Sequence, residues 1–126
     1  MKKILFIGML LMMFVNLAEA QKQYGFDYRT SSTLTSAVAV SVTPVAALTV
    51  YTITADTNIT YSAVVTDAVI GDKFVLQITA DASARIMAFG TNITAVNDTI
   101  TATKTRLYEF IYTGTGYYML GKLQAD

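Results

Sequence analysis

The chain has 126 residues, 53% of them hydrophobic, and its nine basic and nine acidic residues give a formal net charge of zero. Such a balance argues against a nucleic-acid partner and against binding to an anionic membrane surface. Cysteine and histidine are both missing, which excludes disulfides, thiolate metal sites, cysteine nucleophiles and a cysteine-linked lipid anchor. We therefore expect neither a metal nor a cofactor.

The first 20 residues predict a secretory signal peptide. Lys2 and Lys3 form a short positive region, residues 4–17 are largely apolar, and Ala18-Glu19-Ala20 has the pattern of a cleavage site. The apolar stretch is shorter than the roughly 20 residues that cross a bilayer, so we expect no membrane span after cleavage. The mature chain, starting at Gln21, is then secreted, periplasmic, at the cell surface or part of a virion. A retained anchor is the alternative.

The rest of the chain predicts an arm followed by one β domain. Residues 21–33 are polar and aromatic without a clear period, and we interpret them as an N-terminal arm, either disordered alone or packed on a neighbouring subunit. Residues 34–126 contain apolar segments of period two, separated by turn residues. The expected strands are 34–43, 48–54, 59–65, 73–80, 85–89, 99–104, 106–112 and 117–122.

This pattern predicts a small antiparallel β-sandwich of jelly-roll type with seven or eight strands. A β-solenoid is the alternative, because two short segments recur in the sequence. Residues 53–56 (Ile-Thr-Ala-Asp) return 25 positions later at 78–81, and residues 57–60 (Thr-Asn-Ile-Thr) return 34 positions later at 91–94. Since the two spacings differ, we favour shared strand-and-turn chemistry as the explanation of both echoes.

Few residues are candidates for catalysis. Asp56, Asp81 and Asp98 fall at predicted turns, where aspartate caps its own backbone. Glu109 lies in the middle of a predicted strand, and if buried it needs a partner such as Arg85 or Arg106. We favour structural roles for all four carboxylates and do not expect an enzyme.

Two further patterns have structural explanations. Asp67 and Asp72 could contribute to a calcium site, but the segment has no calcium-loop pattern. Three sequons begin at Asn58, Asn92 and Asn97. They are potential glycosylation sites in a eukaryotic secreted protein, but we favour asparagines that serve turns.

Aromatic residues gather in the last predicted hairpin, around residues 113–116. They form the candidate interaction surface, which consists of Tyr108, Phe110, Tyr112, Tyr117 and Tyr118. Such a cluster suits core and cross-strand packing first, an interface with another copy second, and stacking on sugar rings third.

Residues 48–121 resemble small β domains of phage virion structural proteins, of the head-fibre, decoration and tail-associated type. The resemblance rests on Gly71-Asp72-Lys73 before an apolar strand, on the Thr-rich segment 99–105, and on the ending Phe110-Ile111-Tyr112-Thr113-Gly114-Thr115-Gly116-Tyr117-Tyr118. It implies a structural protein without an active site that packs as a trimer or decorates a capsid or tail. The signal peptide departs from that pattern, because phage structural proteins usually lack one.

We therefore expect a non-enzymatic, exported structural or surface-interaction protein that self-associates, with a trimer as the first expected state. A secreted carbohydrate-binding or adhesin module, whose partner is a glycan or a surface protein, is the main alternative. A small glycosidase with two carboxylates in a cleft and a carrier with an apolar barrel cavity are the remaining ones.

Overall fold

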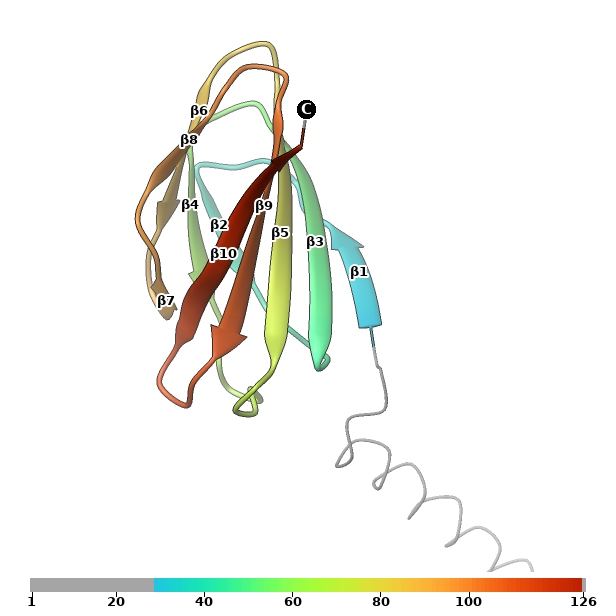
Figure 1. Ribbon diagram of the computed structural model, residues 1–126, viewed down its shortest axis with the longest axis vertical. Coiled ribbons are helices and arrows are strands. Elements are labelled where there is room, and N and C mark those ends of the chain that lie inside the picture. The colour runs from blue at the N-terminus through green and yellow to red at the C-terminus, as the bar shows by residue number, and fades with distance from the viewer. Residues whose placement is uncertain (1–28, 126) are drawn as a thin grey trace, which may run out of the picture.

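The computed structural model describes residues 29–125, which form ten β-strands and no helix (Figure 1). The predicted signal peptide and residues 21–28 of the predicted arm lie outside this range. The strands are β1 (Arg29–Thr33), β2 (Ala39–Val42), β3 (Leu48–Ala55), β4 (Ile59–Ala63), β5 (Lys73–Ala80), β6 (Arg85–Phe89), β7 (Ile93–Thr94), β8 (Asp98–Ile100), β9 (Thr105–Tyr112) and β10 (Tyr117–Ala125). The all-β prediction is confirmed.

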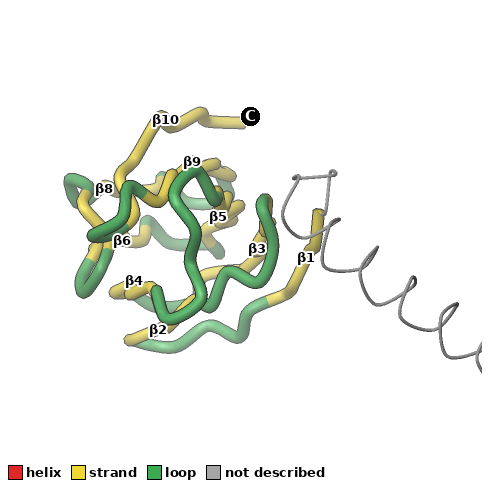
Figure 2. Tube along the Cα trace, turned by 90° about the horizontal axis from the view of Figure 1, so that it is seen from below, coloured by secondary structure: helices red, strands yellow, loops and turns green. Residues whose placement is uncertain are grey.

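The strands form two sheets that enclose one core (Figure 2). The six-stranded sheet has the order β1-β3-β5-β9-β10-β7, and the four-stranded sheet has the order β2-β4-β6-β8. From β1 to β6 the chain alternates strictly between the sheets, so each strand pairs in parallel with the strand two places later. This is a short β-solenoid, in which each coil adds one strand to each sheet.

The prediction of an antiparallel jelly roll was therefore wrong, although two packed sheets are present. Five of the eight strand pairs among residues 29–125 are parallel. Alternation of apolar and polar residues defines the two faces of a strand, but it carries no information about the direction of the neighbouring strand. The predicted arm also contributes a strand, since residues 29–33 form β1.

The segments that recur 25 residues apart lie side by side in neighbouring coils of the solenoid. Ile53 lies beside Ile78 and Ala55 lies beside Ala80 in the parallel β3–β5 pair. The 34-residue echo has no such meaning, because Ile59 lies in β4 of one sheet and Ile93 in β7 of the other. A single period is absent because the corners differ in length. Residues 56–58 turn one corner and residues 64–72 turn the next.

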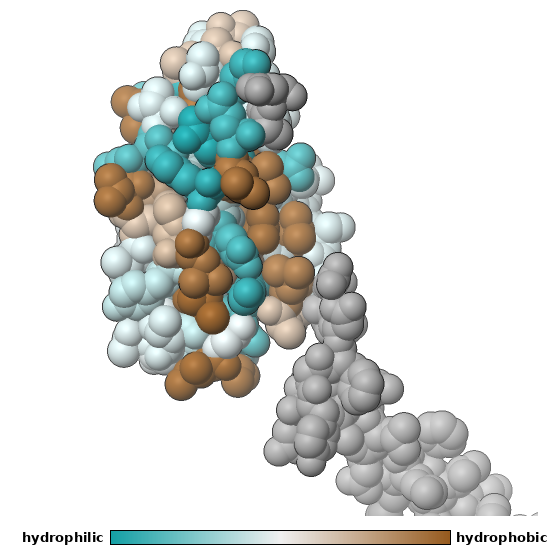
Figure 3. Space-filling model, viewed as in Figure 1, coloured by the Kyte–Doolittle hydropathy of each residue, from teal (hydrophilic) through white to brown (hydrophobic). Residues whose placement is uncertain are grey.

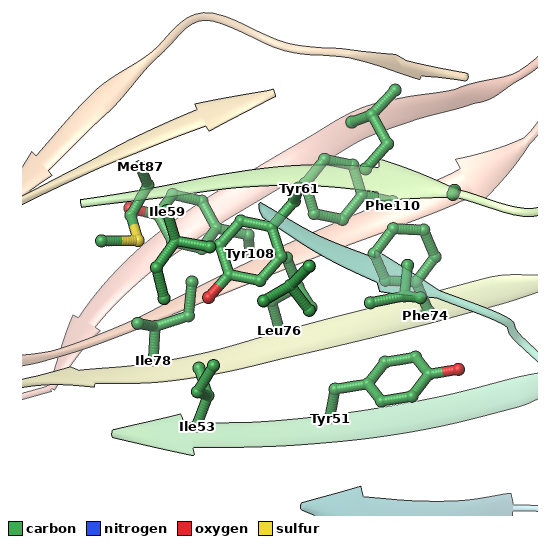
Figure 4. Close-up of a cluster of buried hydrophobic side chains, with 14 of the residues drawn as sticks. Tyr51, Ile53, Ile59, Tyr61, Phe74, Leu76, Ile78, Met87, Tyr108 and Phe110 are labelled. Atoms are coloured by element: carbon green, nitrogen blue, oxygen red, sulfur yellow. The ribbon is translucent and has the colours of Figure 1, made fainter. Parts of the chain in front are cut away.

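Antiparallel strands close the C-terminal end of the stack. β9 pairs with β5, β10 pairs with β9, and β8 pairs with β6, all antiparallel. The aromatic side chains of this cap fill the core against the last coil (Figure 4). The Phe74 ring of β5 stacks on the Phe110 ring of β9 with centroids 4.6 Å apart, and Tyr117 meets Phe74 edge-on at 4.7 Å. This joint ties the parallel part to the antiparallel part through buried rings.

Side chains at the corners connect one coil to the next. The Asn58 Oδ1 atom accepts a hydrogen bond from the Ile86 backbone amide, and the Asn97 Oδ1 atom accepts one from the Phe89 backbone amide. The Asn92 side-chain amide donates to the Ala63 carbonyl at 2.8 Å. All three sequon asparagines thus lie in corners and bind backbone groups of β4 or β6. They satisfy backbone groups that the strand ladders leave unpaired.

Candidate interaction surface

The structure divides the aromatic cluster of the last hairpin between the core and the surface. Tyr108, Phe110, Tyr112 and Tyr117 are buried, whereas Tyr118 is 43% exposed. The register explains this division, because Tyr117 lies beside Tyr112 on the inner face and Tyr118 lies beside Ile111 on the outer face. Four of the five predicted residues therefore pack the core, and Tyr118 alone among them is available to a partner.

The outer face of the six-stranded sheet carries apolar residues among hydrophilic ones (Figure 3). Alternation directs every second residue of β3, β5, β9 and β10 away from the core, and the register brings these residues into rows. A solvated sheet face is normally polar. Here the apolar members, which we call the outer-face patch, are Leu48, Val50, Val75, Leu107, Ile111, Tyr118 and Leu123. Leu123 is 73% exposed.

One ion pair lies within the outer-face patch. The Lys73 ammonium of β5 donates to the Glu109 carboxylate of β9 at 3.1 Å, and both side chains are partly exposed. We predicted Arg85 or Arg106 as the partner of Glu109. This prediction was wrong, because Glu109 pairs with Lys73. Glu109 lies beside Val75 on the outer face, while Arg106 points to the other face of β9. The pair places one positive and one negative charge among the apolar side chains of the patch, and such a pair can set the orientation of a bound surface.

The most connected carboxylate is Asp98 in β8. One of its oxygens accepts hydrogen bonds from Arg106, Lys122 and Tyr108, each at 3.1 Å, and the other accepts the Thr99 amide. Burial opposes ionisation of Asp98, but the hydrogen bonds from Lys122, Thr99 and Tyr108 outweigh it, so the pKa of Asp98 lies below its ordinary value. Asp98 is thus more than the turn residue predicted: it joins the two sheets at the cap.

Asp56, Asp72 and Asp81 lie in corners and accept hydrogen bonds there. Asp81 accepts the Ser83 amide and a two-point hydrogen bond from Arg85, which holds the pKa of Asp81 below its ordinary value. Asp56 accepts the Ser36 hydroxyl at 2.6 Å. Asp72, considered for a calcium site, accepts the Val69 amide instead. Each carboxylate satisfies polar groups of its own neighbourhood.

A shallow hollow of about 120 Å³ lies at the β1 side of the same outer face. Its polar lining comes from Thr33, Thr52, Thr54, Gln77 and Thr79. These neutral groups donate and accept hydrogen bonds, and the Thr33 and Thr52 hydroxyls lie 3.3 Å apart. The outer face is therefore hydroxyl-rich at the C-terminal halves of β3 and β5, whereas the N-terminal halves of the same strands carry Leu48, Val50 and Val75.

Within residues 29–125, no three His, Cys, Asp or Glu side chains form a group that could bind a metal ion. The same stretch of chain contains no helix that is long and apolar enough to span a membrane. No protein-family model matches this chain, and no curated protein matches it either.

Hydrophobic periodicity could have indicated the outer-face patch before the structure. Residues 73–80 alternate as predicted, with Phe74, Leu76 and Ile78 buried. The missed signal is that the other face of the strands also carries apolar residues, namely Val75 in β5 with Leu107 and Ile111 in β9. Apolar residues on both faces of a strand indicate that its second face differs from an ordinary, polar, solvated face.

Proposed function

We propose that this chain is a non-enzymatic, exported structural or surface-interaction protein that works as a homo-oligomer. The observation that carries the proposal is the outer-face patch on the six-stranded sheet. Its apolar side chains surround the Lys73–Glu109 pair, so apolar contact would supply area and the ion pair would set the orientation of a partner. Tyr118 and Leu123 are exposed and the other members of the patch are partly exposed. Apolar residues gathered on a solvent-facing surface support an interaction site.

Two sequence features support an exported assembly. The predicted signal peptide supports export, and the resemblance of residues 48–121 to phage virion domains supports a role in a virion or at a cell surface. Decoration, fibre and envelope-surface assembly share the required property, a rigid β domain that binds copies of itself. A trimer is the first expected state.

Light scattering coupled to size-exclusion chromatography tests this proposal. Leu123→Lys places a charge in the outer-face patch at a position that is 73% exposed, so we expect the fold to persist and the measured mass to fall below that of wild type. The matched control is Val96→Lys, which changes an 86% exposed residue in the corner after β7. A wild-type protein that stays monomeric at every concentration contradicts the proposal.

The second candidate is a secreted carbohydrate-binding or adhesin module. It rests on the hydroxyl-rich hollow, because neutral donors and acceptors suit the hydroxyls of a sugar, although no aromatic ring lines it. Binding to a glycan array that is lost in Gln77→Ala and retained in Tyr118→Ala would favour this candidate. If no glycan on the array is bound, the carbohydrate-binding candidate is rejected and the assembly proposal is unaffected.

A further inference from the structure

The two ends of the six-stranded sheet are protected to different degrees. At one end, β7 has two residues and β10 carries a bulge between Met119 and Gly121. Short strands and bulges are devices that prevent pairing between exposed sheet edges. At the other end lies β1, whose five residues Arg-Thr-Ser-Ser-Thr contain no proline and no bulge, and which pairs only with β3 (Figure 1).

The free edge of β1 presents backbone groups at every second residue. The Leu34 amide donates to the Thr52 carbonyl of β3 at 2.8 Å, so the backbone groups of Ser32 and Thr30 are directed toward β3 as well. Since these groups alternate along a strand, those of Arg29, Ser31 and Thr33 are directed away from the sheet. Three residues therefore offer both a donor and an acceptor at an edge that no described strand covers.

We propose that this edge binds the β1 edge of a second copy, in an antiparallel pair centred on Ser31. The proposal rests on the self-association proposed above and names a second contact for it, distinct from the outer-face patch. A two-fold axis at Ser31 places Ser31 beside its own equivalent and Arg29 beside Thr33 of the other copy, with each pair exchanging two hydrogen bonds.

The sequence of β1 is self-complementary in this arrangement. Pairing at Ser31 brings hydroxyl residues opposite one another, which is favourable across antiparallel strands. It also keeps the two Arg29 positions at opposite ends of the paired strands, so like charges do not face each other. The Ser31 and Thr33 side chains are exposed, so no core side chain has to move for the pair to form.

This contact would continue the six-stranded sheet from one copy into the next. It is isologous, so each β1 edge pairs with one other β1 edge and that contact is then complete. Because the hollow lined by Thr33, Thr52 and Gln77 lies beside this edge, the pair would also bring two such hollows to either side of the two-fold axis.

Charge exchange at Ser31 tests the pairing by sedimentation velocity on the full chain at low ionic strength. Ser31→Lys and Ser31→Glu each place like charges opposite one another, and we expect each variant alone to associate about tenfold more weakly than wild type. An equal mixture of the two places opposite charges across the axis and should restore the association. Ser83→Lys and Ser83→Glu, at an exposed corner, are the matched controls and should leave association unchanged.

Each outcome separates this contact from the outer-face contact. If wild type associates and Leu123→Lys weakens it, but neither Ser31 variant changes it, the edge pairing is wrong and the proposed function stands. If both Ser31 variants weaken association and their mixture does not restore it, Ser31 does not face its equivalent and the pairing is also overturned. If wild type is monomeric throughout, the proposed function fails together with the contact that rests on it.

Discussion

Phe74 and Phe110 stack face to face across the one strand pair that joins the parallel coils of the six-stranded sheet to their antiparallel cap. Both rings are fully buried, and Phe74 also meets Tyr51 and Tyr117. The aromatic residues of the last hairpin thus serve the joint of the fold, and the surface role expected for them is left to Tyr118 and the apolar residues of the outer face.

Phe110→Ala should lower the free energy of unfolding by about 3–5 kcal/mol, because it removes a buried ring and leaves a cavity at the joint. Tyr118→Ala changes an exposed aromatic residue of the neighbouring strand and should cost about 0.5 kcal/mol or less. Urea denaturation followed by circular dichroism measures both. If both variants lost the same free energy of unfolding, the proposed stabilising role of the Phe74–Phe110 contact would be wrong.

The corner asparagines differ in which side-chain atom they use, and this predicts opposite responses to aspartate. Asn58 accepts through its oxygen, which Asp keeps, so Asn58→Asp should change stability little. Asn92 donates its amide to the Ala63 carbonyl, and Asn92→Asp places an oxygen against that carbonyl. We expect a loss of about 1–3 kcal/mol for Asn92→Asp. The reverse order in thermal unfolding would show that the two amides are turned the other way.

Asp98 should make stability depend on pH in the acid range. Its pKa is lowered in the folded protein, so its contribution is present above the unfolded pKa of about 3.9 and is lost as pH falls through the folded value. Asp98→Asn should therefore be less stable than wild type at pH 7, by about 1–3 kcal/mol. The difference should shrink toward pH 2 in urea titrations. A gap that stays constant with pH would rule out the ionic contribution.

Thr103 has a backbone conformation that suits glycine. Its φ is 63°, in the left-handed region, where a β-branched residue is strained. Thr103→Gly should raise the free energy of unfolding by about 0.5–1 kcal/mol. Thr101→Gly, an exposed position in the same corner without a positive φ, should lower it instead, because only chain entropy changes there. If both glycine variants were more stable than wild type, the gain at Thr103 could not be assigned to relief of backbone strain.

Cleavage of the signal peptide predicts the mass of the exported protein. If cleavage follows Ala20, intact-mass spectrometry of the purified chain should give a species that begins at Gln21. An Ala20→Lys variant, with a bulky charged residue at the cleavage site, should accumulate with residues 1–20 attached. Recovery of full-length wild type from the membrane fraction would favour the retained anchor.

The positions of the strands could be predicted from the sequence, but their pairing could not. Alternation located β3, β5, β6, β9 and most of β10, because each places apolar side chains on the core face. β1 was missed because its Ser and Thr residues give no apolar face, and it is held by backbone hydrogen bonds to β3. The parallel direction was missed because corners of three and nine residues hide the coil repeat.

The candidate surface could be predicted only in part, for a related reason. A cluster of aromatic residues gives no sign of which ones face inward until the register of the last hairpin is known. Tyr117 is buried, whereas its neighbour Tyr118 is exposed. Gly121 lies beside Glu109 only because a bulge shifts the register. Glu109 pairs with Lys73, 36 residues away, which only the β5–β9 pairing brings close.

The unequal corners of a single coil have a consequence for how such a chain can evolve. Residues 56–58 and 64–72 turn between the same two sheets, yet one corner is three times as long as the other and the strands on either side keep their alignment. An insertion at a corner leaves every inward residue in place, whereas one added residue inside β5 would exchange its buried and exposed faces. New sequence can therefore accumulate at the 64–72 corner, while the lengths of the strands stay fixed.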